Sequence, residues 1–245
     1  MDRRSAIWLS TPNTAAAEIA SDLGYGAAVL DIEHGAFDLA SLDQFIPFLR
    51  ALGMDVIAKV LAPERGPIQQ ALDFGADAVV IPHIAGVEHA REVTAFAKFP
   101  PAGDRSYAGG RTTGYRGFDD HWVQRQDANT RCYPMVEDAG AFDQVADILA
   151  LPNVDGLFVG PSDLSLRRRR GAYSRNGEDF ADFKLIAEAA KNAGKPWIFP
   201  AWTSAEKQFA VDHGAEQIVV TMEHAALMSG MQASLEEIQA IRAQR

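Results

Sequence analysis

Val154-Asp-Gly-Leu-Phe-Val-Gly-Pro-Ser-Asp-Leu-Ser165 is the stretch of this chain that decides the fold. Its apolar run, Leu157–Val159, has no polar alternation, which is typical of a strand buried on both faces of a sheet. A Gly-Pro pair ends the strand abruptly. Ser162 and Asp163 then follow at its carboxyl end, where the next segment can offer backbone N–H groups to an anion. We therefore expect a buried parallel strand with a polar tip.

The preceding strand carries a second acid at its tip. Tyr133–Val136 is also apolar and ends at Glu137. The carboxyl ends of successive parallel strands lie at one edge, so Glu137 and Asp163 could share a hard divalent cation, which prefers oxygen ligands. Two protein ligands would leave coordination positions for water and substrate oxygens. Alternatively, each acid caps the helix that follows it. The spacing alone leaves both interpretations open.

The same alternation of strand and helix continues in both directions from this stretch. Helices end in glycine, and an apolar strand begins a few residues later. Repeats at intervals of roughly 25–30 residues favour a (β/α)8 barrel. A doubly wound open sheet would require a phosphate-binding fingerprint after the first strand, and Ser10–Asn13 is not one. The predicted strands are residues 6–9, 27–30, 56–58, 78–81, 132–136, 156–159, 197–199 and 217–220.

The helices between these strands have recognisable starts and ends. The predicted helices cover about residues 13–23, 38–52, 67–74, 87–96, 139–149, 179–192 and 203–212, followed by a last helix to about 242. Two segments, 99–130 and 167–177, lack the pattern. The first is expected to be a lid or a partly helical excursion. The Arg167–Arg170 run in the second is a solvated loop, a cover for an acidic substrate or a subunit contact.

Composition limits the classes of protein that this chain can belong to. With 245 residues, 47% of them hydrophobic, and no linker, we expect a single domain over residues 1–245. The formal net charge of −10 argues against a general binder of nucleic acid or anionic membranes. We expect neither a signal peptide nor a membrane span. The only cysteine, Cys132, falls in a predicted buried strand and fits a reducing cytoplasm.

Other strand tips carry groups suited to proton transfer and charge stabilisation. An unperturbed imidazole suits proton transfer at neutral pH, so His34 could act as a general base, with Asp31 orienting its ring. The alternative is a surface histidine beside solvated acids, among them Glu33. Lys59 could stabilise a developing enolate oxygen, or simply extend from a strand end to water. Of the remaining histidines, only His83 lies at a strand tip.

Several segments, in this order, resemble the metal-dependent pyruvate aldolases of the HpcH/HpaI family, whose wider group includes citrate lyase β subunits and malyl-CoA lyases. The segments are Asp31-Ile-Glu-His34, Gln70–Pro82, Phe99-Pro-Pro-Ala-Gly-Asp-Arg105, Val136-Glu137 and Val154–Ser165. The resemblance implies a barrel of the phosphoenolpyruvate/pyruvate-domain type. It also implies a carboxy-terminal helix exchanged between the subunits of a dimer, and dimers that assemble into a homohexamer.

The resemblance also assigns roles to individual residues. Glu137 and Asp163 match metal ligands, for which Mg²⁺, Mn²⁺ or Co²⁺ is expected. His34 matches the catalytic histidine, with Asp31 as its partner. The backbone around Gly160, Pro161, Ser162 and Asp163 matches the groups that hold the pyruvate carboxylate.

Two positions depart from the family pattern. Lys59 replaces an arginine and keeps its charge without the bidentate fork. Met135 replaces a glutamine and offers no strong hydrogen bond. Both changes affect the expected stabilisation of the enolate.

The hypothesis is therefore a cytoplasmic class II aldolase, a carbon–carbon lyase acting on a 4-hydroxy-2-oxo acid through a pyruvate enolate. The metal would chelate the carboxylate and keto oxygens of the substrate. One alternative is a lyase or condensing enzyme on another acidic substrate, such as a CoA thioester or oxaloacetate. A second is a non-catalytic barrel that binds an oxo acid. The expected partners are a small-molecule substrate and further copies of the chain, with no nucleic acid or membrane.

Overall fold

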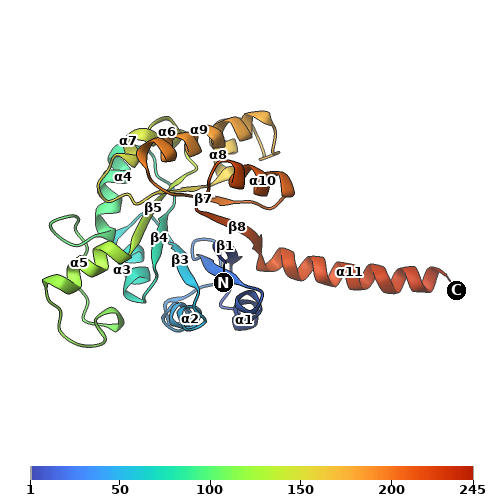
Figure 1. Cartoon of the computed structure of the whole chain (residues 1–245), viewed down its shortest axis with the longest axis horizontal. Helices are drawn as coiled ribbons and strands as arrows, with labels where there is room; N and C mark the ends of the chain where they lie inside the picture. The colour runs from blue at the N-terminus through green and yellow to red at the C-terminus, as the bar shows by residue number, and fades with distance from the viewer. Residues whose placement is uncertain (1, 245) are drawn as a thin grey trace.

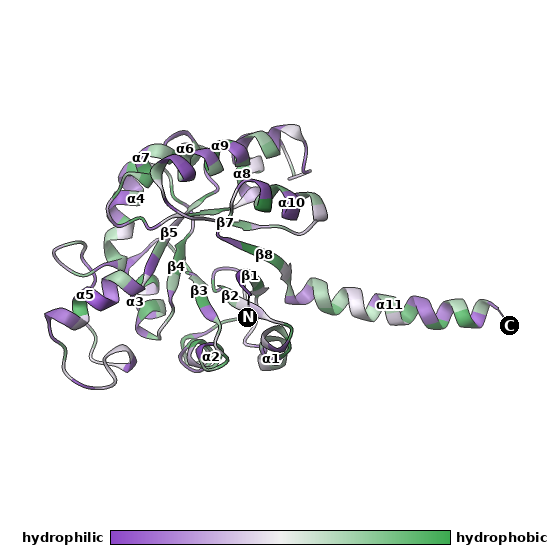
Figure 2. Ribbon diagram, in the orientation of Figure 1, coloured by the Kyte–Doolittle hydropathy of each residue, from purple (hydrophilic) through white to green (hydrophobic). Residues whose placement is uncertain are grey.

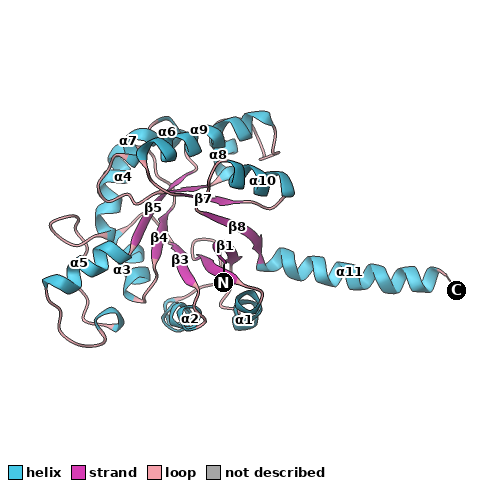
Figure 3. Cartoon of the chain, in the orientation of Figure 1, coloured by secondary structure: helices cyan, strands magenta, loops and turns pink. Residues whose placement is uncertain are grey.

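The computed structural model describes residues 2–244, which form a closed barrel of parallel strands in the order β1 to β8 (Figures 1 and 3). The predicted (β/α)8 fold is confirmed. The strands are β1 (Asp2–Leu9), β2 (Tyr25–Asp31), β3 (Asp55–Lys59), β4 (Ala78–Ile81), β5 (Arg131–Val136), β6 (Leu157–Val159), β7 (Trp197–Pro200) and β8 (Gln217–Met222).

Helices surround the barrel, and two short 3₁₀ turns lie between β4 and β5. The α-helices are α1 (Thr14–Asp22), α2 (Leu39–Ala51), α3 (Arg65–Asp73), α4 (Val87–Thr94), α5 (Asp120–Asn129), α6 (Ala139–Asp143), α7 (Val145–Leu149), α8 (Pro161–Arg167), α9 (Gly177–Ala193), α10 (Ser204–Asp212) and α11 (Glu223–Ala243). The 3₁₀ turns are η1 (Ala95–Ala97) and η2 (Arg111–Thr113).

The hydrophobic core has two layers, as the alternation of side chains along a barrel strand requires. Inside the barrel, a small cluster contains Trp8, Tyr133, Met135 and Phe158, all nearly inaccessible to solvent. A larger cluster fills the space between the strands and the surrounding helices. Cys132 belongs to this outer layer and is buried, as predicted.

Local sequence signals placed most helix starts well. The side chain of Asn13 accepts a hydrogen bond from the N–H of Ala16 and caps α1. Asp38 and Ser41 form a reciprocal capping box at the start of α2. The segment 99–130, expected to be a lid or a partly helical excursion, contains η2 and α5.

Two features around β5 and β6 differ from the prediction. The helix expected over residues 139–149 is interrupted at Gln144, whose ψ of 21° leaves the helical range. Its side-chain oxygen accepts a hydrogen bond at 2.8 Å from the N–H of Val87, so Gln144 caps α4 instead of continuing its own helix. The short helix α8, directly after β6, was not predicted as an element of its own.

The arginine run at the end of α8 is tied into the fold. Arg167 pairs with Asp138 at 2.9 Å, and Arg168 pairs with the buried Asp182 at 2.8 Å. Arg170 also forms an ion pair with Asp182. The expected freely solvated loop is therefore wrong for these three side chains, which attach α8 to α9 and to the residue after Glu137.

Helix α11 extends away from the barrel, and hydrophobic residues recur along it (Figures 1 and 2). Beyond Glu223, which is buried, nearly all of its residues are exposed. An apolar groove of about 680 Å³ lies between α1 and the first turns of α11. Among residues 2–244, no helix is long and apolar enough to cross a membrane.

Candidate active site

The predicted catalytic residues of β2 and β3 meet at the carboxyl end of the barrel. Asp31 and Lys59 are direct partners in the register of the two parallel strands. The Lys59 Nζ lies 3.1 Å from Asp31 Oδ1 and also forms an ion pair with Glu33. Lys59 is only 3% exposed. A buried ammonium group with two carboxylate partners is held in place.

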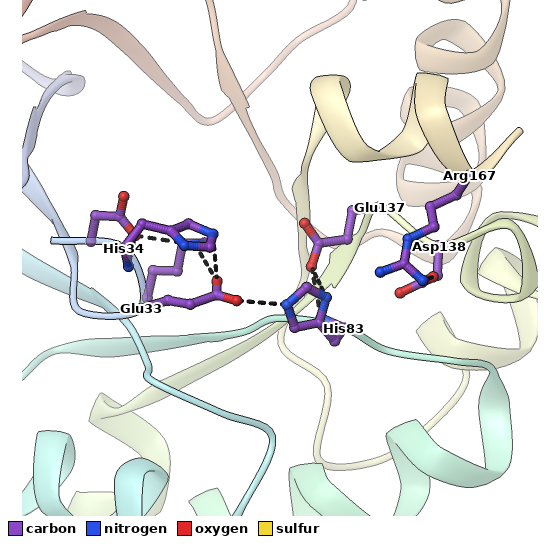
Figure 4. A network of polar contacts seen from close by, with 8 residues as sticks. Glu33, His34, His83, Glu137, Asp138 and Arg167 are labelled. Carbon is purple, nitrogen blue, oxygen red and sulfur yellow. Dashed lines mark hydrogen bonds and ion pairs between the residues drawn. The ribbon is translucent and has the colours of Figure 1, made fainter. Parts of the chain in front are cut away.

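Glu33 connects this ion pair to the tip of β4 (Figure 4). Its Oε1 lies 2.6 Å from Nε2 of His83. Burial opposes ionisation of Glu33, but the hydrogen bonds from Lys59 and His83 and the charges of Lys59 and His34 outweigh it and lower the pKa of this carboxyl group. Glu33 therefore stays ionised between two cationic or donating groups.

His83 in turn contacts Glu137, the acid at the tip of β5. The backbone N–H of His83 donates a hydrogen bond to Glu137 Oε1 at 2.7 Å. The ring Nδ1 lies 3.3 Å from the same oxygen but is not aligned for a hydrogen bond. A continuous chain of polar groups thus runs from Lys59 through Glu33 and His83 to Glu137.

Glu137 is a buried carboxylate, and it does not cap the helix that follows it. The residue that precedes α6 is Asp138, and no side-chain cap is formed there. Burial raises the pKa of Glu137, and the nearby charge of Asp163 acts in the same direction. A Cβ atom on Gly160 would lie 2.9 Å from Glu137 Oε2, so only glycine leaves this carboxylate its space.

The ring of His34 has a different neighbour from the one predicted. Asp31 accepts a hydrogen bond from the backbone N–H of His34 at 3.3 Å, rather than from the ring. The ring Nε2 lies 3.5 Å from Glu33 Oε2, and the side chain is 65% exposed. Asp31 thus fixes the turn that carries His34, while Glu33 lies beside the imidazole.

The donor set at Glu137 fits a hard divalent cation with open coordination positions. Within the described range, no cluster of three or more His, Cys, Asp or Glu side chains forms a closed metal cage. Two neighbouring carboxylates, Glu137 and Asp163, are instead what Mg²⁺ uses when water and substrate complete its shell. Burial is the main reason that the pKa of Glu137 is raised, and a cation would offset both that burial and the added repulsion from Asp163.

Two residues of this site received no role in the sequence-based prediction. Glu33 was placed at the tip of its strand, within the Asp31–His34 motif, and was a solvated acid only in the alternative interpretation of His34. His83 stood out only by its place after an apolar strand. Of the two departures, Lys59 is in the network, whereas Met135 packs inside the barrel with Phe158. A Cβ on Gly160 would also meet the Cε of Met135 at 2.7 Å.

Curated relatives cover most of the chain. A hydroxypyruvate/pyruvate aldolase of Roseobacter denitrificans is 29% identical over 91% of this chain and 87% of its own length. A 4-hydroxy-2-oxovalerate aldolase of Novosphingobium aromaticivorans is 31% identical over 77% of this chain and 72% of its own.

Solved structures agree with the fold over nearly the full length. A HpcH/HpaI aldolase/citrate lyase family protein from Burkholderia cenocepacia superposes with a TM-score of 0.87 and 27% identity, covering 96% of this chain and 94% of the other. An aldolase from Desulfitobacterium hafniense gives a TM-score of 0.89 at 24% identity, with 96% and 92% covered. The family model described as HpcH/HpaI aldolase/citrate lyase matches residues 4–219. This chain belongs to the HpcH/HpaI aldolase/citrate lyase family.

Proposed function

We propose that this protein is a class II aldolase, a carbon–carbon lyase that cleaves or forms a 4-hydroxy-2-oxo acid through a pyruvate enolate. One observation carries the proposal: the buried carboxylate of Glu137 lies beside Gly160 and Asp163 and is joined by a polar chain to the ammonium of Lys59. The relatives named as pyruvate and hydroxy-oxo acid aldolases support it.

Glu137 and Asp163 would hold the divalent cation, for which Mg²⁺, Mn²⁺ and Co²⁺ are the candidates. When bound, the cation supplies a Lewis acid that polarises the keto group and stabilises negative charge on its oxygen. Gly160 keeps the space next to Glu137 Oε2 open for it. The backbone from Gly160 to Asp163 would bind the carboxylate of the oxo acid, as the resemblance implies.

Lys59 would stabilise the enolate oxygen with a fixed positive charge. Its ion pairs with Asp31 and Glu33 orient the ammonium before the substrate arrives, so little reorganisation is needed in the transition state. The ammonium group of lysine is a compact point charge, whereas the guanidinium group of arginine is planar and can donate two parallel hydrogen bonds. The position therefore keeps the electrostatic contribution of the family's arginine and loses its bidentate geometry.

His34 would move the proton of the 4-hydroxyl group. An imidazole titrates near neutrality, which suits a proton donor and acceptor at pH 7. Its exposed ring can reach a bound substrate, while Asp31 holds its backbone and Glu33 lies beside its Nε2. Asp31 thus accepts a hydrogen bond from the backbone of His34 and pairs with the ammonium of Lys59.

The decisive test is pyruvate release from 4-hydroxy-2-oxo acids after addition of Mg²⁺, Mn²⁺ or Co²⁺. We expect metal-dependent turnover that falls at least 100-fold in Glu137→Gln, since one of only two carboxylate ligands loses its charge. Glu18→Gln, a change at an exposed position on α1, is the matched control and should leave the rate unchanged. Full activity of Glu137→Gln would contradict the assignment.

A substrate screen separates the remaining alternatives. Turnover confined to CoA thioesters or oxaloacetate would select another lyase or condensing reaction. Binding of Mn²⁺ and pyruvate without exchange of the pyruvate methyl protons in D₂O would select the non-catalytic barrel.

We also propose that α11 is exchanged between two copies and that such dimers assemble into hexamers. The exposed apolar residues of α11 and the apolar groove beside α1 support the exchange, because a lone barrel leaves both uncovered. A cytoplasmic location belongs to the same proposal and is supported by the free, buried thiol of Cys132.

A further inference from the structure

We propose that His83 is a positioning residue of this site, whose backbone holds the carboxylate of Glu137 and whose ring holds the Glu33–Lys59 ion pair. The inference rests on the proposed function and assigns a role to a residue outside the sequence motifs. It follows from three observations on the loop after β4.

The first observation is the backbone conformation of His83. Its φ of 56° lies in the left-handed region, which costs a non-glycine residue free energy and which asparagine tolerates better than most. This conformation accompanies the N–H bond of 2.7 Å to Glu137 Oε1. The backbone donor fixes one oxygen of the acid proposed to hold the metal.

The second observation is the partner of the ring. Nε2 lies 2.6 Å from Glu33 Oε1, while the other oxygen of Glu33 pairs with Lys59. Glu33 extends from the turn after β2, and Lys59 ends β3. The ring therefore anchors the ion pair from a third strand tip.

The third observation is that one residue makes both contacts. The ammonium of Lys59 and the carboxylate of Glu137 would act on the same substrate from β3 and β5. Between them lies β4, and His83 is the residue beyond its end that touches the groups from both sides (Figure 4). Catalysis by fixed charges requires such charges to keep their spacing. His83 sets that spacing.

Two substitutions separate the backbone contact from the ring contact. His83→Asn keeps a residue that accepts a left-handed backbone and removes the ring. We expect Mn²⁺ affinity within about 3-fold of the parent enzyme and a kcat lowered by about 10- to 100-fold, with a small change in KM. His83→Val opposes the left-handed backbone because its side chain is β-branched. We expect its Mn²⁺ affinity, measured calorimetrically, to fall by about 10- to 100-fold.

The coupling between ring and carboxylate is tested by a double-mutant cycle on kcat. Glu33→Gln alone should lower kcat, and the double variant should lose less than the product of the two single losses, because both changes remove the same His83–Glu33 contact. His121→Asn, an exposed position on α5, is the matched control. Additive effects in the cycle, parental kcat in His83→Asn or parental Mn²⁺ affinity in His83→Val would each overturn the assignment.

Metal-free crystal structures keep this test independent of the proposed function. We expect the Glu137 carboxylate to be displaced in His83→Val and the Glu33 carboxylate to be displaced in His83→Asn. If the parent protein binds no Mn²⁺ and makes no pyruvate, the proposed aldolase fails, and the crystals alone decide the role of His83. Unmoved carboxylates in both variants would refute it.

Discussion

At the scale of single residues, Gly160 shows how strongly the site depends on a missing side chain. An added Cβ would lie 2.7 Å from Glu137 Cβ, 2.7 Å from Met135 Cε and 2.9 Å from Glu137 Oε2. The terminal methyl group of Met135 can move aside, but the Cβ of Glu137 moves only with its backbone. The carboxylate must therefore shift.

Gly160→Ala should weaken Mn²⁺ binding at least 10-fold, because it displaces a proposed ligand. Gly177→Ala is the matched control, since a Cβ there meets no atom within 4 Å. Calorimetric titration with Mn²⁺ checks both variants. Equal affinities would mean that Glu137 adapts to the added methyl group.

Lys59 also contributes to the stability of the fold. Removing its charge leaves Asp31 and Glu33 largely buried without their cation. Lys59→Met should therefore lower the free energy of unfolding by about 3 kcal/mol. The control is Lys184→Met, whose exposed pair with Glu188 at 3.8 Å should contribute less than about 1 kcal/mol. Urea denaturation measures both, and a fully stable Lys59→Met would contradict the electrostatic account.

These residues also mark how far sequence reasoning reaches. Strand tips are predictable because a buried apolar run followed by a turn leaves the next polar residues at the barrel mouth. That argument placed Lys59 and Glu137 correctly at the carboxyl end. The link between Glu33 and His83 was not predictable, because it depends on the conformations of two loops and on a left-handed backbone.

At the scale of elements, Glu206 joins the loop after α8 to the start of α10. Its buried carboxylate accepts hydrogen bonds from Tyr173 at 2.7 Å and from the Thr203 backbone at 2.7 Å, and lies 3.1 Å from Arg175 Nε. Burial opposes ionisation, but these bonds outweigh it and hold the pKa of Glu206 below its ordinary value of 4.5.

Glu206→Gln should destabilise the protein by about 3 kcal/mol at pH 7. A carboxylate with a lowered pKa stabilises the fold fully above pH 4.5 and loses that contribution as the pH falls through its folded-state pKa. The difference in unfolding free energy between parent and variant should thus shrink as the pH falls below 4.5. Chemical denaturation at several pH values measures it. A constant difference would show that the charge of Glu206 is not involved.

Element boundaries illustrate a second limit of prediction from sequence. Helix starts with a capping side chain, such as Asn13 and Asp38, are local and were predicted. The interruption at Gln144 is not local, because this side chain caps a helix that begins at Val87. The hydrophobic periodicity of residues 139–149 does not reveal that Gln144 bonds to a residue so distant in the sequence.

At the scale of the whole molecule, α11 carries an uncovered apolar stripe. Leu227, Met231, Leu235 and Ile238 recur at intervals of three or four residues, so they share one face, and all are exposed. Burying this face against a second copy would remove it from water.

The double substitution Met231→Glu and Leu235→Glu should convert the proposed assembly to smaller species, because it places two charges in the proposed contact. Ser229→Glu places a charge on the opposite face of α11 and should leave the size of the assembly unchanged. Light scattering coupled to gel filtration measures the mass of each. A parent protein that is monomeric at all concentrations would refute the exchanged helix.

The burial of Cys132 has a practical consequence. It is the only thiol in the sequence and lies on β5, the strand that ends beside Glu137. Burial raises its pKa, so the reactive thiolate forms only when the strand is released to solvent. The rate at which Cys132 is alkylated in the native protein thus reports the rate at which β5 opens, and no introduced label is needed. Any ligand that Glu137 helps to hold should slow the alkylation of Cys132.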